Sequence, residues 1–147
     1  MQLKSFTAAT LFGLFLLPLA HAQVSQSLQG NIPFNFRVGN TVLPAGEYAI
    51  RPLNNGSFVF LMRSLEHNGK AVMGLSYKVH ESSNQSPKLV FHRYGDTYFL
   101  SQIWGGDEGA GSALLPSKAE RVMAHEMATI TRPHHEMELA SIGFIRR

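Results

Sequence analysis

The sequence predicts an all-β fold: a single antiparallel domain of about eight strands, a β-sandwich or partly open barrel, with one C-terminal amphipathic helix. One observation is a series of short segments between Asn31 and Trp104, most of them bounded by Gly, Asn or Pro. Their apolar residues alternate or form short runs, which indicates strands joined by tight turns. The other observation is that helical spacing of apolar residues is clear only after Ser117.

The first strand is predicted from Ile32 to Val38, where apolar residues occupy every second position. Such a strand has one buried side and one side facing solvent. Pro33 has no N–H group to donate to a neighbour, which places this strand at an edge of the sheet. Gly39-Asn40 then reverses the chain, and Leu43-Pro44-Ala45-Gly46 has the composition of a type I turn.

Two Asn-Gly pairs, Asn55-Gly56 and Asn68-Gly69, carry the strongest short-range signal for a β-hairpin. Both residue types tolerate the positive φ angles of a type I′ turn. The pairs separate strands predicted at Glu47–Leu53, Phe58–Met62 and Ala71–Val79. The middle strand is apolar on both sides, which predicts a central strand covered on both faces.

The stretch from Leu89 to Trp104 places His92, Arg93 and Asp96 close together in sequence. We predict a hairpin with Gly95-Asp96 as its loop, which pairs Tyr94 with Thr97, Arg93 with Tyr98, His92 with Phe99, and Phe91 with Leu100. Paired residues share a face of the sheet. One face then carries Leu89, Phe91, Tyr98, Leu100 and Trp104, and the other carries Val90, His92, Tyr94, Phe99, Ser101 and Ile103. His92 and Arg93 therefore point to opposite faces, and the three side chains do not form a reactive site.

The helix is predicted at about 117–128 from its start signal and its periodicity. Ser117 is a candidate N-cap, and Glu120 three residues later completes a capping box. One apolar stripe, formed by Ala119, Val122, Met123 and Met127, is expected to pack against the sheet. Pro133 ends the helical pattern, and the segment from Met137 to Ile145 is a candidate last strand.

The N-terminus has the three parts of a secretory signal peptide. Lys4 precedes an apolar run from Phe6 to Leu19, and Ala20-His21-Ala22 supplies the small residues of a cleavage site. The apolar run is shorter than the ~20 residues of a membrane-spanning helix. We therefore expect residues 1–22 to be removed between Ala22 and Gln23, leaving residues 23–147 as a single β-rich domain in the periplasm or outside the cell, with no transmembrane anchor.

Composition excludes several classes of function. The chain has no cysteine, which rules out disulfides, thiolate metal sites and cysteine nucleophiles. A cysteine-free secreted protein of this size is typical of a bacterial envelope. The formal net charge is +3, and the basic residues are dispersed rather than clustered, which argues against a nucleic-acid surface.

Candidate chemical groups are present, but none forms a recognised motif. A metal site near the C-terminus is conceivable from His125, His134, His135, Glu136 and Glu138, although their spacing fits no known helix motif. Asp107-Glu108 lies in a loop, and no nucleophile elbow or His-Glu-x-x-His sequence accompanies it. We therefore assign no catalytic, cofactor-binding or metal-binding residue.

Aromatic residues are more numerous than one small core face requires. They are Phe58, Phe60, Tyr94, Tyr98, Phe99 and Trp104. Such residues line a pocket for an apolar molecule or a sugar in some sheets, and fill a two-sided core in others. The sequence leaves both interpretations open.

Three segments together resemble a family of small exported bacterial proteins with no assigned activity. The segments are FNFRVGNTVLPAGEY, which contains PAGEY, LVFHRYGDTYFLSQIW, and LLPSKAER at the start of the helix. The resemblance extends from about Ile32 to Arg121, implies export and a mostly β domain, and supplies no site residue or cofactor. We therefore expect a non-enzymatic envelope protein that acts by binding or structure, with a small apolar-ligand or sugar carrier, or a hydrolase, as alternatives. Its partner would be such a ligand or another envelope protein.

Overall fold

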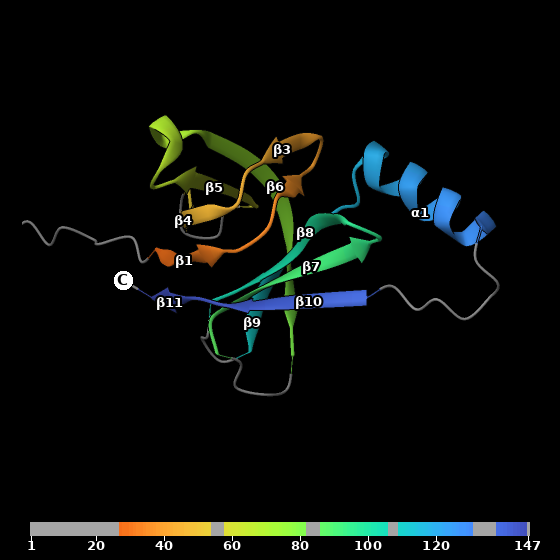
Figure 1. Cartoon of the computed structure of the whole chain (residues 1–147). Coiled ribbons are helices and arrows are strands. Elements are labelled where there is room, and N and C mark those ends of the chain that lie inside the picture. Colours follow the sequence, from red (N-terminus) through yellow and green to blue (C-terminus); the bar gives the residue numbers. More distant parts are fainter. Residues whose placement is uncertain (1–26, 54–57, 82–85, 106–108, 131–137, 147) are drawn as a thin grey trace, which may run out of the picture.

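The computed structural model describes residues 27–53, 58–81, 86–105, 109–130 and 138–146, and these residues form a mostly β protein (Figure 1). The strands are β1 (Leu28–Ile32), β2 (Phe36–Val38), β3 (Thr41–Leu43), β4 (Gly46–Pro52), β5 (Val59–Ser64), β6 (Ala71–His80), β7 (Lys88–Tyr94), β8 (Thr97–Trp104), β9 (Ala110–Leu114), β10 (Glu138–Gly143) and β11 (Ile145–Arg146). A short 3-10 turn spans His67–Gly69, and α1 spans Lys118–Ile130. The predicted signal peptide and the Asn55-Gly56 turn lie outside the described residues.

The strands form one mixed sheet that is not closed into a barrel. Its order is β10-β7-β8-β9-β6-β5-β4-β1-β11, and β2 pairs with both β3 and β8. The β2–β8 pair is parallel, so the prediction of a wholly antiparallel domain was wrong there. The described residues form eleven strands instead of about eight, and the predicted sandwich is not confirmed. One reason for the larger count is Pro33, which separates β1 from β2 because it cannot donate a ladder hydrogen bond.

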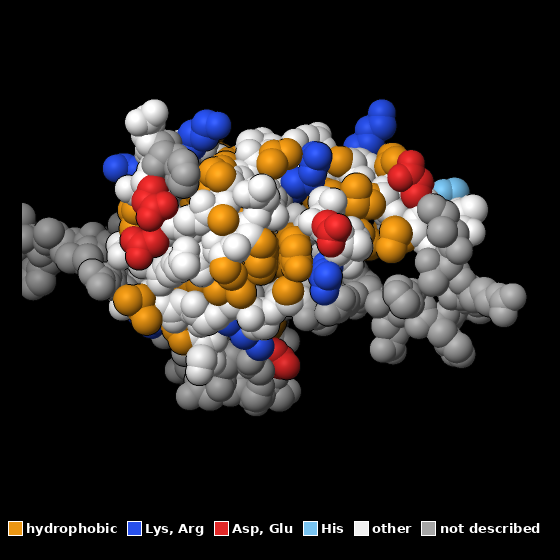
Figure 2. All heavy atoms as spheres, viewed as in Figure 1, with side chains coloured by type: hydrophobic (Ala, Val, Ile, Leu, Met, Phe, Trp, Pro, Cys, Tyr) orange, Lys and Arg blue, Asp and Glu red, His pale blue; other side chains and the backbone are white. Residues whose placement is uncertain are grey.

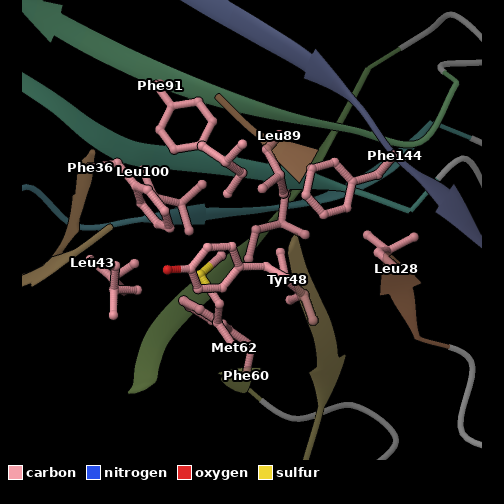
Figure 3. Packing of buried hydrophobic residues seen from close by; sticks show 14 residues of the cluster. Leu28, Phe36, Leu43, Tyr48, Phe60, Met62, Leu89, Phe91, Leu100 and Phe144 are labelled. Carbon is pink, nitrogen blue, oxygen red and sulfur yellow. The ribbon is translucent and has the colours of Figure 1, made fainter. Parts of the chain in front are cut away.

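One long strand, β6, joins the two halves of the sheet, which are β5-β4-β1-β11 on one side and β9-β8-β7-β10 on the other. Residues 71–75 pair with β5, and residues 76–80 pair with β9. The hydrophobic core lies between the halves, where side chains of β1, β4 and β5 meet those of β7 and β8 (Figure 3). The core residues are Leu28, Ile32, Phe36, Val38, Leu43, Tyr48, Ile50, Phe60, Met62, Leu89, Phe91, Leu100, Ile103 and Phe144.

The predicted last strand is confirmed, and it is split between the two ends of the sheet. β10 pairs with β7, whereas β11 pairs with β1. Phe144, between them, is 6% exposed and donates its backbone N–H to the carbonyl oxygen of Pro87 at 2.8 Å. Its ring lies in the core, so one buried aromatic residue anchors the segment as it passes from one half of the sheet to the other (Figure 3).

Three glycines show how tightly the interior is filled. A Cβ atom built on Gly74 would lie 2.3 Å from the ring of Phe60, directly opposite it on β5. On Gly111 it would lie 2.6 Å from the indole of Trp104, and on Gly30 it would lie 2.8 Å from the ring of Phe144. An aromatic ring therefore covers the backbone at each glycine and leaves no space for a methyl group.

The hairpin between β7 and β8 has the predicted register around its loop. All four predicted pairs are present, and Gly95 has a φ of 59°. A β-bulge then shifts the register, because Val90 pairs with Gln102 whereas Phe91 pairs with Leu100, which leaves Ser101 as the extra residue. Beyond it the predicted faces were wrong: Ile103 lies in the core, and Trp104 lies on the opposite face.

The alternation predicted from Ala71 to Val79 is confirmed, but its large apolar side chains face outward. Met73, Leu75 and Tyr77 are 66%, 70% and 47% exposed. Their smaller neighbours, such as Gly74, face the core, where Phe60 fills the space. The prediction that β5 is covered on both faces was also wrong: Phe60 and Met62 are buried on its core side, whereas Val59 and Leu61 on the other side are only half-buried.

The helix begins as predicted. Ser117 Oγ accepts a hydrogen bond from the backbone N–H of Glu120 at 3.1 Å, which is the N-cap contact. The helix projects from the sheet, with its first turn nearest to the β7–β8 hairpin (Figure 1). The predicted packing of its stripe is therefore incomplete: Met123 and Met127 are half-buried, but Val122 is 49% exposed. Within the described part of the chain, no helix has the length and apolarity to span a membrane.

Candidate functional site

Four polar side chains meet where α1 begins, on the side of the β7–β8 hairpin that faces away from the core. His92 and Tyr94 come from β7, Ser101 comes from β8, and Glu120 comes from the first turn of α1. We refer to these four residues as the Glu120 cluster. In this cluster, titratable groups from β7 and α1 come together.

The distances within the cluster define a continuous chain of hydrogen bonds. His92 Nδ1 lies 2.6 Å from Glu120 Oε1, and His92 Nε2 lies 2.8 Å from Ser101 Oγ. The Tyr94 hydroxyl donates a longer hydrogen bond to the same Glu120 oxygen at 3.5 Å. A neutral imidazole with its proton on Nδ1 satisfies the network, because it donates to the carboxylate and accepts from the serine hydroxyl.

Two of the four residues are buried, which makes their hydrogen bonds costly to lose. Glu120 is 5% exposed, and Ser101 is 6% exposed. Burial raises the pKa of Tyr94 above its ordinary value of 10.0, and the nearby Glu120 carboxylate raises it further. Tyr94 therefore stays protonated at neutral pH and remains a hydrogen-bond donor. Its ring also packs edge-on against Phe99, with centroids 5.8 Å apart.

Local backbone features place two of these groups. The β-bulge makes Ser101 an extra residue on β8, and its side chain lies on the same face as His92. The N-cap fixes the first turn of α1, and Glu120 sits within that turn. The capping-box prediction was correct for the backbone N–H of Glu120, but the carboxylate of this residue binds His92. The half-buried imidazole thus replaces the N-cap backbone as its partner.

The order Ser–His–carboxylate is that of a hydrolytic triad, in which the imidazole accepts the serine proton. In this chain the serine lies within a paired strand and is 6% exposed. The carboxylate belongs to α1, so moving this helix away to admit a substrate would also withdraw Glu120. The geometry therefore suits a polar clamp that fastens α1 to the sheet.

The residues that stand beside His92 in the sequence have other positions. The Nε of Arg93 donates to the carbonyl oxygen of Gly95 at 2.8 Å, and its guanidinium lies 5.6 Å from the ring centroid of Tyr98. Asp96 is exposed in the hairpin loop. His92, Arg93 and Asp96 are thus separated, in agreement with the predicted register.

The sequence placed His92 and Ser101 on one face, but it did not identify Glu120 as their partner. No sequence signal joins residues 28 positions apart on a helix and a strand. Among the residues that the structure describes, no group of three or more His, Asp or Glu side chains is arranged to hold a metal ion. His125 is exposed on α1, whereas Asp107, Glu108, His134, His135 and Glu136, and the side chain of Glu138, lie outside the description.

Most of the numerous aromatic residues pack against other side chains of the protein. Phe60, Phe99 and Trp104 are buried, and Tyr98 stacks on Phe34 with centroids 3.9 Å apart. Phe58 is the exception, at 59% exposure. These contacts support the interpretation as a two-sided core.

Charged side chains are scattered over the face seen in Figure 2, with single basic residues separated by neutral surface. No protein-family model, curated protein or solved structure matches this chain. Inferences about its role therefore depend on the residues and their geometry.

Proposed function

We propose that this chain is an exported, non-enzymatic protein of the bacterial envelope that acts by contact, through binding or structure. The observation that carries this proposal is the outward apolar side of β6, where Met73, Leu75 and Tyr77 are exposed on a regular strand. Contiguous exposed apolar residues are typical of interaction surfaces. The tightly covered glycines of the interior favour contact at the surface over carriage of a ligand within the core.

Export is supported by the signal-like segment before Gln23, and the absence of cysteine fits a bacterial envelope better than a disulfide-rich extracellular scaffold. The test is to express the full chain with a C-terminal tag in a bacterial host and to measure the intact mass of the fractionated protein. We expect loss of residues 1–22 and recovery from the periplasm or the medium. A charged residue at the cleavage site, Ala22→Arg, should block this processing, and a cytoplasmic protein that retains Met1 would contradict export.

A carrier of a small apolar molecule or sugar is the alternative within the binding class. It requires an interior cavity of several hundred Å³. Native mass spectrometry of the protein purified from the exporting cell separates the two roles. We expect the mass of the polypeptide alone, and a stoichiometric small-molecule adduct would favour the carrier.

A hydrolase is a second candidate because Ser101, His92 and Glu120 have the connectivity of a triad. In that mechanism Ser101 Oγ would attack an ester carbonyl while His92 takes its proton, and the ester C–O bond would break as His92 returns that proton to the leaving alcohol. Water would then attack the acyl-serine, releasing the carboxylic acid and restoring the serine hydroxyl. We expect no turnover of short-chain nitrophenyl esters above that of the Ser101→Ala variant. Serine-dependent hydrolysis, with labelling of Ser101 by a fluorophosphonate, would establish the enzyme instead.

A further inference from the structure

Met73 lies in the most open part of the outward side of β6. It is 66% exposed, and Leu75, two residues further on the same side, is 70% exposed. The pairing register explains this exposure. On one edge of β6, Met73 lies opposite Leu61 of β5, but on the other edge β9 pairs only with residues 76–80. Within the described part of the chain, no strand therefore flanks Met73 on that edge.

The described methionines differ widely in their exposure. Met62 on β5 is 1% exposed and belongs to the core, and Met123 and Met127 on α1 are half-buried. A peroxide reaches a thioether sulfur from solvent, so exposure sets the order in which these side chains react. Among the described methionines, Met73 is therefore the most open to oxidation.

Oxidation of Met73 needs only a peroxide as co-reactant. The thioether sulfur gives two electrons to hydrogen peroxide and the O–O bond breaks; one oxygen atom binds the sulfur, and the other leaves as water. The product, methionine sulfoxide, is polar where the thioether was apolar. On the opposite side of β6, the ring of Phe60 already fills the space at Gly74, so the change falls on the surface and leaves the core intact.

We propose that Met73 is an oxidation site that controls the contact surface on β6, because its sulfoxide weakens apolar contacts made there. This inference rests on the proposed contact function and names its regulation. Leu75 lies on the same side of the strand and Leu61 lies directly opposite, so the sulfoxide oxygen interrupts a set of apolar side chains. An apolar partner offers this oxygen no donor, and burying it without a hydrogen bond is costly.

The first test measures where a peroxide reacts. The protein purified from the exporting cell is treated with hydrogen peroxide, and its peptides are analysed by mass spectrometry over time. We expect the sulfoxide to form at Met73 at least about tenfold faster than at Met62. Met123 and Met127 should react at intermediate rates. A rate at Met73 that does not exceed the rates at the other three overturns the site.

The second test measures the effect on the surface, as retention on a phenyl column in ammonium sulfate. Peroxide should shorten the retention of the wild-type protein and leave its circular dichroism spectrum unchanged. Met73→Leu, which is apolar but has no sulfur at this position, should elute at the same place before and after treatment. Met123→Leu is the matched control and should respond as the wild type does. Equal shifts in the wild type and in Met73→Leu overturn the proposal, because another methionine would then be responsible.

The untreated variant Leu75→Lys separates failure of this inference from failure of the proposed function. If Leu75→Lys shortens the retention but peroxide does not, the outward side of β6 is an apolar contact surface and only the role of Met73 is overturned. If neither change shortens the retention, this side makes no apolar contact, and the proposed function loses the observation that carries it.

Discussion

At the scale of single residues, Glu120 joins the helix to the sheet. Its carboxylate accepts hydrogen bonds from His92 and Tyr94 in a site that is nearly closed to water. Removing a buried acceptor leaves its donors without a partner, which costs more than an exposed contact contributes. We therefore expect the Glu120 cluster to contribute more to the free energy of unfolding than a similar set of exposed hydrogen bonds would.

We predict that Glu120→Ala lowers the free energy of unfolding by roughly 1–3 kcal/mol, because it removes the buried carboxylate that accepts the hydrogen bond of His92 Nδ1. Urea unfolding followed by circular dichroism measures this change. Glu126→Ala, at an exposed position on the same helix, should change it by less than about 0.5 kcal/mol. Equal effects of the two substitutions would contradict the clamp.

Alkaline pH should weaken the folded state through two tyrosines. Burial raises the pKa of Tyr94 and that of Tyr48, and nearby carboxylates add to each effect, from Glu120 and Glu66 respectively. The unfolded chain then loses these protons at lower pH than the folded protein does. Stability is fully present below about pH 10 and decreases as the pH rises toward the raised values.

Urea unfolding at several pH values between 8 and 11 measures this slope. Tyr94→Phe should make the alkaline decrease shallower, whereas Tyr77→Phe, at an exposed residue of β6, should leave it unchanged. The same decrease in the wild-type protein and in Tyr94→Phe would show that Tyr94 contributes nothing to it.

At the scale of elements, strands could be predicted wherever turn chemistry and alternation agree. The β7–β8 hairpin has its predicted pairs because Gly95 supplies the positive φ that a tight loop requires. Asn68 and Gly69 also have positive φ angles, of 57° and 66°. Their loop is longer than a two-residue turn, however, because Ser64 donates its N–H to the carbonyl oxygen of Lys70.

The bulge at Ser101 and the outward side of β6 could not be predicted from pattern alone. A bulge adds one residue and reverses every face after it, yet nothing in the sequence around Ser101 marks it. On β6 the apolar pattern predicts a buried side, but the core side is already filled by Phe60 lying on Gly74. The sequence pattern therefore predicts that side chains alternate between two faces of the strand. Which of the two faces is buried depends on side chains of the neighbouring strand, here Phe60.

We predict that Gly74→Ala destabilises the protein by roughly 1–3 kcal/mol, because the new methyl group would meet the ring of Phe60. Gly143→Ala on β10 is the matched control, since nothing lies within 4 Å of the added Cβ. Its effect should be smaller than about 0.5 kcal/mol. Thermal unfolding of both variants provides the measurement, and a neutral Gly74→Ala would show that Phe60 can move aside.

At the scale of the whole molecule, the sequence predicts a mostly β domain with one late helix, but it does not predict the order of the strands. The parallel β2–β8 pair joins segments far apart in the chain, and local periodicity does not report such partners. The same limit applies to the candidate site. His92 and Ser101 could be placed on one face, whereas Glu120 arrives through the path of the whole chain.

We predict that Phe144→Ala lowers the free energy of unfolding by roughly 3–5 kcal/mol, because a large buried ring is removed where β10 passes into β11. Ile145→Ala, the adjacent position at 54% exposure, should cost less than about 1 kcal/mol. Guanidinium unfolding compares the two. Similar losses at both positions would contradict anchoring of the segment by the Phe144 ring.

The division of the last segment between β7 and β1 also constrains the timing of assembly. β1 is the first described strand to leave the ribosome, yet one of its two neighbours, β11, is the last. Pairing between such distant segments closes a long loop and slows folding. During synthesis the sheet must therefore wait, with one border of β1 open, until residues 145–146 emerge.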